Sequence, residues 1–479
     1  MSIDHVDVLI VGAGLSGIGA ACQLKQHHPQ RSVALLESRS ASGGTWDLFR
    51  YPGIRSDSDM FTLGYHWRPW RNDRALADGP SILGYVRDVA REYGVDELIR
   101  YDRRVVGASW DSATARWTVE VEHGDQREQL TTNFLWGCSG YYDYEQGYAP
   151  DFPGTERFTG QIVHPQHWPE DLDYTGKRVV VIGSGATAVT VVPAMTDRAA
   201  HVTMLQRSPT YVVSVPAIDP LARLLRRVPE RIAYPIVRWK GILVALTSYQ
   251  LSRWRPNLLR GLIRRETRKL LPETVDVDIH FKPTYDPWDQ RLCLVPDGDL
   301  FNALSAGTAS IVTDTIDTFT ETGIRLTSGA ELEADLVITA TGLNLKAFGG
   351  IDFTVDGAAV KIPETMAYKA LMLSGVPNFA FTIGYTNASW TLKADLVGEY
   401  VCRLLSHLDE HGHRSAVPVP DEDIVEAPFM DFSSGYVQRS LDELPKQGDR
   451  EPWKLRQQYL YDRRKIRRGE IDDGVLRFA

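Results

Sequence analysis

Hydrophobic residues along the chain gather into short runs separated by glycine-rich turns, which is the pattern of buried strands alternating with helices. The first run covers residues 6–11 and leads into an alanine-rich helix through Gly12, Gly14 and Gly17. Glycine at these positions permits positive φ and a close approach of backbone to a pyrophosphate. A second apolar strand ends at Glu37, where a carboxylate would accept hydrogen bonds from ribose hydroxyls. We therefore interpret this stretch as a dinucleotide cradle rather than a glycine turn that only packs.

The same pattern recurs after an apolar strand predicted over residues 178–182. The turn positions are here occupied by Gly183, Gly185 and Ala188. The following strand ends with Arg207 and Ser208, where a ribose with a free 2′-hydroxyl would need a carboxylate. A guanidinium and a hydroxyl suit a 2′-phosphate, although a surface arginine ending a strand would give the same sequence. This second cradle is therefore predicted to prefer NADPH.

Two cradles in one chain imply that a mobile nicotinamide passes electrons to a resident flavin, so FAD is expected in the first cradle. An apolar strand over residues 336–339 suits a chain returning to the first dinucleotide domain. The predicted fold class is α/β, with two Rossmann-like dinucleotide-binding domains and a helical insertion. The expected segments are 1–150 and 336–479 for the FAD-binding domain with the C-terminal region, 151–210 and 286–335 for the NADPH-binding domain, and 211–285 for the insertion.

Composition narrows the function classes. The formal net charge of −9 argues against a nucleic-acid partner. The four cysteines lie far apart with no CxxC pair, so neither a disulfide framework nor a metal site is indicated. The chain starts with acidic residues and an apolar strand rather than a secretion signal, and no uncharged apolar run reaches the roughly 20 residues of a membrane span. We expect a cytoplasmic protein.

Without a CxxC dithiol to receive electrons, the reduced flavin is expected to react with O2. The stretch over residues 43–60 is rich in glycine and aromatic residues and directly follows the ribose carboxylate. Its glycines allow the backbone to approach a cofactor, and its aromatic rings supply flat walls. The cofactor-binding residues expected here are Gly44, Thr45, Trp46 and Asp57, together with Val105.

Two later stretches supply further candidates. Arg291 enters an apolar strand, where an unpaired charge would be costly. It would stabilise an oxygen anion with Asp57 orienting it, although an ordinary buried ion pair fits the spacing equally well. Asn387 precedes a helix expected to start near residue 391, whose N-terminus would face the flavin pyrimidine. Trp390 is interpreted either as a substrate wall or as core.

The connector between the cradles matches the pattern FxGxxxHxxxWP through Phe158, Gly160, His164, Trp168 and Pro169. With two Rossmann turns in the same order, the chain resembles the type I Baeyer–Villiger monooxygenases over nearly its whole length. It is especially similar to a branch that oxidises thioamide prodrugs. The resemblance implies tightly held FAD, reduction by NADPH, and a C4a-peroxyflavin that converts ketones to esters or lactones and sulfides or thioamides to S-oxides.

The resemblance also assigns residues. Arg291 matches the active-site arginine and Asp57 the aspartate that supports it. Gln290 stands where many relatives carry a lysine that grips the 2′-phosphate, so Arg207 would contribute more of the discrimination. Two alternatives remain: an N- or S-oxidising flavin monooxygenase without ketone activity, and a non-catalytic NADPH-responsive protein at a membrane.

The connector itself contains two histidines, His164 and His167, but HxxH without an acidic partner is poor evidence for a metal site. In the family the fingerprint histidine belongs to the linker between the two domains and does no direct chemistry. We interpret His164 and Trp168 as a hinge brace that relays domain rotation to the active site, with packing alone as the alternative.

A stretch from Leu221 to Leu270 differs in character from the rest of the chain. It holds thirteen Lys or Arg against two acidic residues, a net charge of +11 in an acidic protein. Its helical spacing of apolar residues predicts a helical insertion over the active-site cleft. A basic amphipathic segment with tryptophans also suits peripheral contact with an anionic membrane, whereas a capping subdomain with a solvated face is the alternative.

Overall fold

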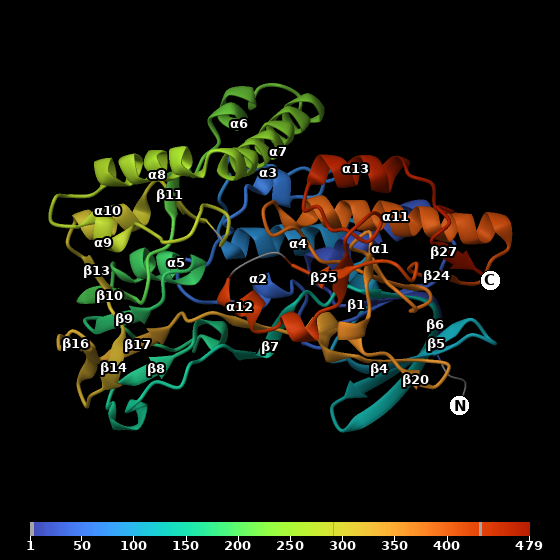
Figure 1. The fold of residues 1–479 in the computed structure, drawn as a ribbon, viewed down its shortest axis with the longest axis horizontal. Coiled ribbons are helices and arrows are strands. Elements are labelled where there is room, and N and C mark those ends of the chain that lie inside the picture. The colour runs from blue at the N-terminus through green and yellow to red at the C-terminus, as the bar shows by residue number, and fades with distance from the viewer. Residues whose placement is uncertain (1–3, 291, 431–433) are drawn as a thin grey trace.

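The computed structural model describes residues 4–290, 292–430 and 434–479. Arg291, the expected active-site arginine, lies outside the described residues. Two sheets lie side by side in Figure 1, the N-terminal sheet on the right and the second sheet on the left, with helices along the upper edge. This arrangement is the α/β fold expected from the sequence.

The first sheet is built around β1 (Asp4–Val11), which pairs in parallel with β2 and β6. Its hydrogen-bonded order is β20 (Ala358–Ala359), β19 (Asp352–Val355), β4 (Arg104–Asp111), β5 (Arg116–His123), β6 (Gln126–Gly137), β1, β2 (Val33–Leu36) and β3 (Ile99–Arg100). From β6 it branches to β23 (Phe379–Phe381), β22 (Met372–Leu373) and β21 (Ala367–Tyr368). Alternate β1 residues reach opposite faces: Val8 and Ile10 pack with α1, and Leu9 and Val11 join the other core.

Helices cover the α1 side of this sheet. They are α1 (Leu15–His27), α2 (Thr45–Leu48), α3 (Met60–Leu63), α4 (Gly79–Glu92), α11 (Trp390–His411) and α13 (Tyr459–Arg468). Two small antiparallel two-stranded sheets and a short helix complete the region: β24 (Ala416–Pro418) with β27 (Leu476–Phe478), β25 (Glu426–Pro428) with β26 (Lys446–Gly448), and α12 (Gly435–Gln438). Helix α11 packs along α1, so a segment that starts 375 residues later in the sequence covers the first turn.

The second sheet is parallel throughout its described strands. Its order is β13 (Ala309–Thr313), β10 (His201–Gln206), β9 (Arg178–Ile182), β17 (Leu336–Thr339) and β8 (Gln161–Val163). It packs with α5 (Ala186–Met195), α9 (Val277–His280) and α10 (Asp299–Ser305). Beside it lie β11 (Val212–Val215) paired with β12 (Cys293–Pro296), and the small sheet of β14 (Ile316–Phe319), β15 (Gly323–Leu326) and β16 (Glu331–Glu333). Because β17 belongs to this sheet, the expected boundary at residue 336 falls too early.

The chain crosses between the sheets twice. It leaves the first sheet through β7 (Tyr142–Gly147) and returns through β18 (Leu343–Leu345), and these two strands pair in an antiparallel manner. The return therefore begins after the turn at Gly342 rather than before β17. The connection between the two dinucleotide units is a two-stranded ribbon.

The insertion consists of α6 (Pro220–Leu225), α7 (Glu230–Trp254) and α8 (Pro256–Leu270), as the helical spacing predicted. Helix α7 lies on α3, at the upper edge of the molecule in Figure 1. Arg238 fixes this contact, because its guanidinium is buried and donates to the backbone carbonyls of Phe61 in α3 and of Gly64 just after it. The insertion is thus firmly attached to the first domain as well as to the second.

Candidate functional site

A cavity of 1190 Å³ is lined by both glycine-rich turns. Of the residues predicted from the sequence, those that line it are Gly12, Gly14, Glu37, Gly44, Thr45, Trp46, Asp57, Val105, Gly183, Gly185, Arg207, Ser208, Gln290 and Trp390. Ligand pockets for one small molecule usually measure about 300–1,000 Å³, so this cavity is large enough for two extended cofactors. The two cradles therefore open into one shared space.

The first turn brings backbone close to backbone. Gly12 has a φ of +104°, and a Cβ there would lie 2.6 Å from the carbonyl oxygen of Cys138. A Cβ on Gly17 would lie 1.9 Å from the Gly12 oxygen, so this glycine serves the packing of α1 on β1 and does not line the cavity. A Cβ on Gly14 would lie 3.5 Å from the Gly44 Cα. The two glycines therefore form a narrow floor that carries no side chain. Such a floor fits a pyrophosphate at the start of α1.

Glu37 lies at the end of β2, as predicted. One carboxylate oxygen accepts a hydrogen bond from the Ala13 N–H at 2.8 Å, and the other accepts from the Arg39 N–H at 3.0 Å. Burial raises the pKa of this carboxyl, opposed by these hydrogen bonds. The backbone thus holds Glu37 against the wall of the cavity, in the position that a ribose-binding carboxylate requires.

The second turn repeats the construction. Gly183 has a φ of +137°, and a Cβ there would lie 2.3 Å from the carbonyl oxygen of Ala340, while Ala188 is fully buried in the packing of α5. At the end of β10, Gln206 turns inward and donates to the carbonyl of His280 at 2.8 Å. Arg207 is exposed and lines the cavity. A guanidinium at this place fits a 2′-phosphate, so the residues present match NADPH.

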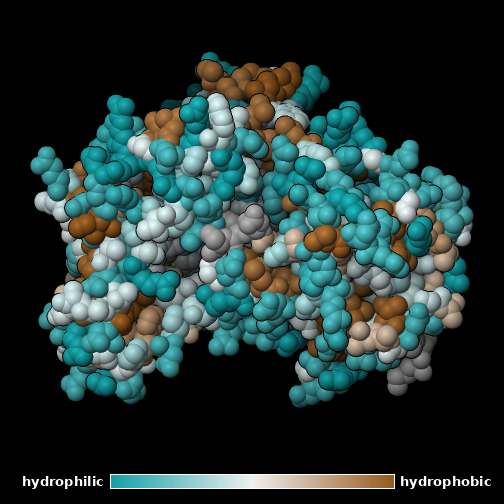
Figure 2. Space-filling model, in the orientation of Figure 1, coloured by the Kyte–Doolittle hydropathy of each residue, from teal (hydrophilic) through white to brown (hydrophobic). Residues whose placement is uncertain are grey.

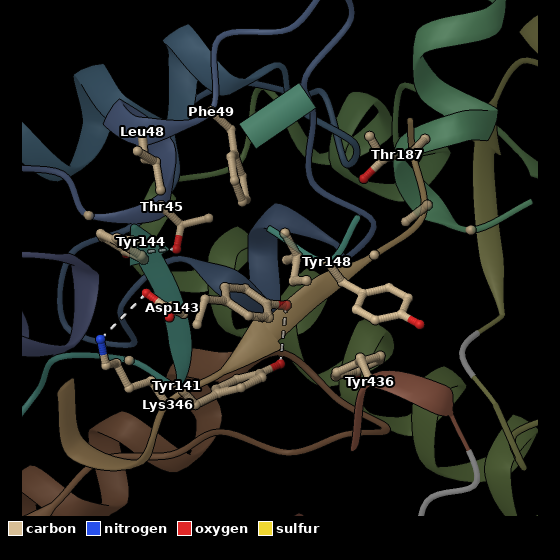
Figure 3. Close-up of a pocket in the computed structure, with 18 of the residues that line it drawn as sticks. Thr45, Leu48, Phe49, Tyr141, Asp143, Tyr144, Tyr148, Thr187, Lys346 and Tyr436 are labelled. Carbon is tan, nitrogen blue, oxygen red and sulfur yellow. Dashed lines mark hydrogen bonds and ion pairs between the residues drawn. The ribbon is translucent and has the colours of Figure 1, made fainter. Parts of the chain in front are cut away.

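The stretch over residues 43–60 connects the two cradles. Thr45 lies 3.1 Å, hydroxyl to hydroxyl, from Tyr144, which comes from β7 (Figure 3). Tyr51 is buried in the core of the second domain and bonds Thr187 of α5, and burial raises the pKa of its phenol. Arg55 forms an ion pair with Asp299 of α10. This segment is therefore a second physical link between the domains, besides the crossing ribbon.

Two predicted residues at α11 differ in their outcome. The Asn387 amide donates to the backbone carbonyl of Gln457 at 3.0 Å, and the residue is buried and does not line the cavity. A C-terminal segment thus takes one donor of the Asn387 amide, and cofactor binding by this residue stays a prediction. Trp390 does line the cavity: its indole N–H donates to Ser16 at 2.7 Å, and its ring stacks on Tyr141 at 5.2 Å.

The connector fingerprint lies against the crossing ribbon. Phe158 packs on Phe319 in the core of the second domain, and a Cβ on Gly160 would lie 2.5 Å from the Phe158 ring. Trp168 packs on the same domain, and the carbonyl of Pro169 accepts from the Leu172 N–H. These four residues therefore hold the connector to the second domain.

His164 instead faces the ribbon. Its Nε2 donates to the carbonyl of Gly342 at 3.2 Å, and its Nδ1 accepts from the Gln166 N–H at 3.2 Å. Burial lowers the pKa of the imidazole, so the ring is neutral at pH 7 and its two partners place the proton on Nε2. A Cβ on Gly147 would lie 2.0 Å from the ring. The imidazole thus contacts both crossing strands at once.

The sequence pattern missed the aromatic wall supplied by β7 and the residues that flank it. Figure 3 shows Tyr144 of β7 beside Thr45, with Tyr141 and Tyr148, from just before and just after the strand, around the same cavity. Lys346 approaches Asp143 at 3.7 Å across the ribbon. The run of four tyrosines over residues 141–148 was the available signal, but it follows no cofactor motif.

The insertion does not supply the cavity walls that its position suggested. None of the described residues of α6, α7 or α8 lines the cavity, whose upper wall comes from residues 54–58 and Leu63. The expectation that these helices lie directly over the cleft is wrong, because α3 intervenes between α7 and the cavity.

Comparison with known proteins agrees with this site. The chain matches the family model described as flavin-binding monooxygenase-like over residues 75–372, and an NAD(P)-binding Rossmann-like domain over residues 10–77. It is 58% identical to the FAD-containing monooxygenase EthA of Mycobacterium tuberculosis, covering 99% of this chain and 98% of that protein. It is 53% identical to the putative FAD-containing monooxygenase MymA of the same species, with the same coverage.

Among solved structures, an oxidized steroid monooxygenase bound to NADP superimposes with a TM-score of 0.74 at 25% identity. The match covers 87% of this chain and 88% of that one.

Proposed function

Since this chain belongs to the flavin-binding monooxygenase-like family, we propose that it uses FAD and NADPH to insert one atom of O2 beside a carbonyl or onto a sulfide or thioamide. The second oxygen atom leaves as water. The substrate is a small molecule, and the proposed reaction is of the Baeyer–Villiger type, with S-oxidation as its companion. The support comes from the two cradles that open into one cavity, with the complete FxGxxxHxxxWP connector between them.

Bound FAD, once reduced by NADPH, supplies the electrons and activates O2. Residues that would hold both cofactors line the cavity: Glu37 would bind the ribose of the flavin nucleotide, and Arg207 would bind the 2′-phosphate of NADPH. Tyr141 and Trp390 form a stacked pair at the start of α11. Their rings wall the cavity beside the first turn and exclude water from it.

The proposed catalytic pair is Arg291 with Asp57. Asp57 lines the cavity, as do Gln290, Cys293 and Leu294, the described neighbours of Arg291 in sequence. A guanidinium is always charged, so in this role it stabilises negative charge on the reacting oxygen without a proton transfer. Asp57 is proposed to orient it. Arg291→Ala should retain FAD and NADPH-dependent flavin reduction while losing ketone oxidation.

The linker is proposed to transmit domain movement. Hydride transfer from bound NADPH and the later oxygenation would need different placements of the second domain relative to the first. His164 contacts both strands of the ribbon about which such a shift would occur. We therefore assign it a positioning role rather than a chemical one.

A panel of a cyclic ketone, a phenyl ketone, an aryl sulfide and a thioamide tests the proposal. Ester or lactone from either ketone, with NADPH consumed in equal amount, is the expected result. Sulfide or thioamide oxidation without any ester would favour the flavin-containing N- or S-oxidising class instead. The absorption spectrum of the purified protein is an independent readout: colourless protein that rebinds no FAD on reconstitution would contradict both.

A further inference from the structure

The insertion carries an unpartnered apolar surface. Of the 16 large hydrophobic side chains that are exposed among the described residues, ten belong to α6, α7 and α8. They are Leu224, Ile232, Ile236, Trp239, Leu243, Val244, Trp254, Leu258, Leu262 and Leu270, and we call them the insertion face. Figure 2 shows apolar side chains gathered at the upper end of the molecule, over α6 and α7. Scattered exposed apolar residues are normal, but a contiguous group marks an interaction surface.

Helix α7 is apolar on two sides. Its inner side, with Tyr234, Val237 and Ile242, is buried against the first domain. Its outer side shows Ile232, Ile236, Trp239 and Leu243 at spacings of four, three and four residues, which places them in one stripe. A capping helix with a solvated outer face would be polar in this stripe. The outer side of α7 is therefore built to be covered.

The stripe continues onto the neighbouring helices. Trp254 ends α7 with 74% of its surface exposed, and the guanidinium of Arg255 lies 4.7 Å above its ring. Leu224 of α6 is 76% exposed. On the other side, Arg463 of α13 lies 5.2 Å from the ring of Trp239. Tryptophan and arginine together are the side chains that suit the boundary between lipid headgroups and acyl chains.

The charges of the insertion divide into two groups. Those facing the body are paired, for example Arg260 with Asp286 and Arg264 with Asp278. The outer group is exposed and forms no salt bridge with any residue the structure describes: Arg223, Arg226, Arg227, Arg231, Arg255 and Arg265. Six uncompensated cations surround an apolar surface in a chain whose net charge is −9. The complementary partner is therefore both anionic and apolar.

We propose that the insertion face docks the protein on an anionic lipid bilayer, with the apolar stripe among the acyl chains and the arginines at the headgroups. The contact is peripheral, since no helix among the described residues is long and apolar enough to span a membrane. A second copy of the chain is a poorer occupant, because a two-fold contact would bring the same arginines against each other. Each cation near an anionic surface adds favourable binding energy, and the apolar stripe adds a term that salt does not screen.

Vesicle flotation of the full-length holoprotein tests the proposal. We expect strong co-flotation with vesicles containing phosphatidylglycerol and much weaker co-flotation with pure phosphatidylcholine vesicles. Raising the salt from about 0.05 M to about 0.5 M should weaken but not abolish binding, because only the charge contribution is screened. A triple variant, Arg226→Gln, Arg227→Gln and Arg231→Gln, should reduce the affinity on the order of a hundredfold.

A second variant separates the apolar contribution. Ile236→Ser with Leu243→Ser keeps every charge and should lose binding at high salt first. Val425→Ser removes an apolar side chain outside the insertion face that is more exposed than Ile236 or Leu243, and it should float like the wild type. FAD content and NADPH oxidation should be the same in all of these proteins, since none of these residues lines the cavity.

Absence of flotation with either vesicle would overturn the proposal. Equal binding to both lipids would also overturn it, if the arginine variant binds as strongly as the wild type. If the variants instead convert an oligomer to monomers in light scattering while no protein floats, the face is an interface between copies of the chain.

Discussion

Arg238 is the strongest single attachment of the insertion to the first domain. Its Nη1 donates to the carbonyls of Phe61 at 2.9 Å and Gly64 at 2.7 Å, and its Nη2 reaches Asp395 at 3.3 Å. The side chains of Arg238 and Asp395 are 7% and 5% exposed, so water replaces none of these bonds. Arg238→Met keeps most of the side-chain volume but leaves a buried carboxylate with one partner fewer.

Removing one member of a buried pair costs about 3–5 kcal/mol, and His66, whose Nδ1 lies 2.9 Å from the Asp395 carboxylate, remains as its other partner. The unfolding entropy is about 2.1 cal/mol/K per residue near the melting temperature, which for 479 residues gives about 1 kcal/mol/K. Arg238→Met should therefore lower the melting temperature by about 3–5 °C if the chain unfolds as one unit. In this variant, hydrogen exchange should be accelerated relative to the wild type more at the amides of α7 than at those of α8.

Thermal unfolding of the holoprotein, followed by tryptophan fluorescence, measures this change. Arg265→Met is the matched control, because Arg265 is exposed on α8 and forms no salt bridge with a described residue. Its melting temperature should stay within about 1 °C of the wild type. Adding Asp395→Asn to Arg238→Met should restore part of the loss by removing the buried charge that Arg238 no longer balances. If Arg238→Met melts at the same temperature as the control, the attachment does not depend on this cation.

Three further outcomes follow from the site and its surroundings. Gly147→Ala should push the His164 ring aside and slow flavin reduction by NADPH by about tenfold or more at unchanged FAD content, measured by stopped flow. Arg207→Gln should raise the KM for NADPH about ten- to a hundredfold and leave the KM for NADH nearly unchanged; equal changes for both would refute 2′-phosphate recognition. Burial raises the pKa of Asp59 from 3.8 to about 6. The folded protein therefore binds this proton more tightly than the unfolded chain, and the wild type loses stability as pH rises between these values. Asp59→Asn, which still caps α3, should become progressively more stable than the wild type across that window in denaturant melts; a pH-independent difference would contradict this.

The cradles were predictable because their signals are local. Gly12 and Gly183 adopt positive φ within four residues of the strands that precede them, and Glu37 sits at the end of its own strand. Steric and hydrogen-bonding requirements of this kind depend only on residues close together in the sequence. The same is true of the helical insertion, where the spacing of apolar residues alone indicated α7 and α8.

The remaining features depend on contacts between distant segments. Asn387 is diverted by Gln457, and Thr45 meets Tyr144 about a hundred residues later. Strand β17 joins the second sheet although the chain around it reads as a return to the first. No local pattern shows which distant segments pack on each other. For the same reason the sequence did not show that Leu63 of α3, and not the insertion, lines the cavity.

The ring of His164 occupies the space that any side chain larger than hydrogen at position 147 would need. His164 and Gly147 therefore constrain each other, because the ring can keep its position only while residue 147 has no side chain. Substitution at either position is restricted by the other. A search for chains built with this ribbon gains selectivity if it requires a glycine seventeen positions ahead of the connector histidine. Chains that keep the histidine but have lost that glycine are expected to seat the ring differently against the ribbon.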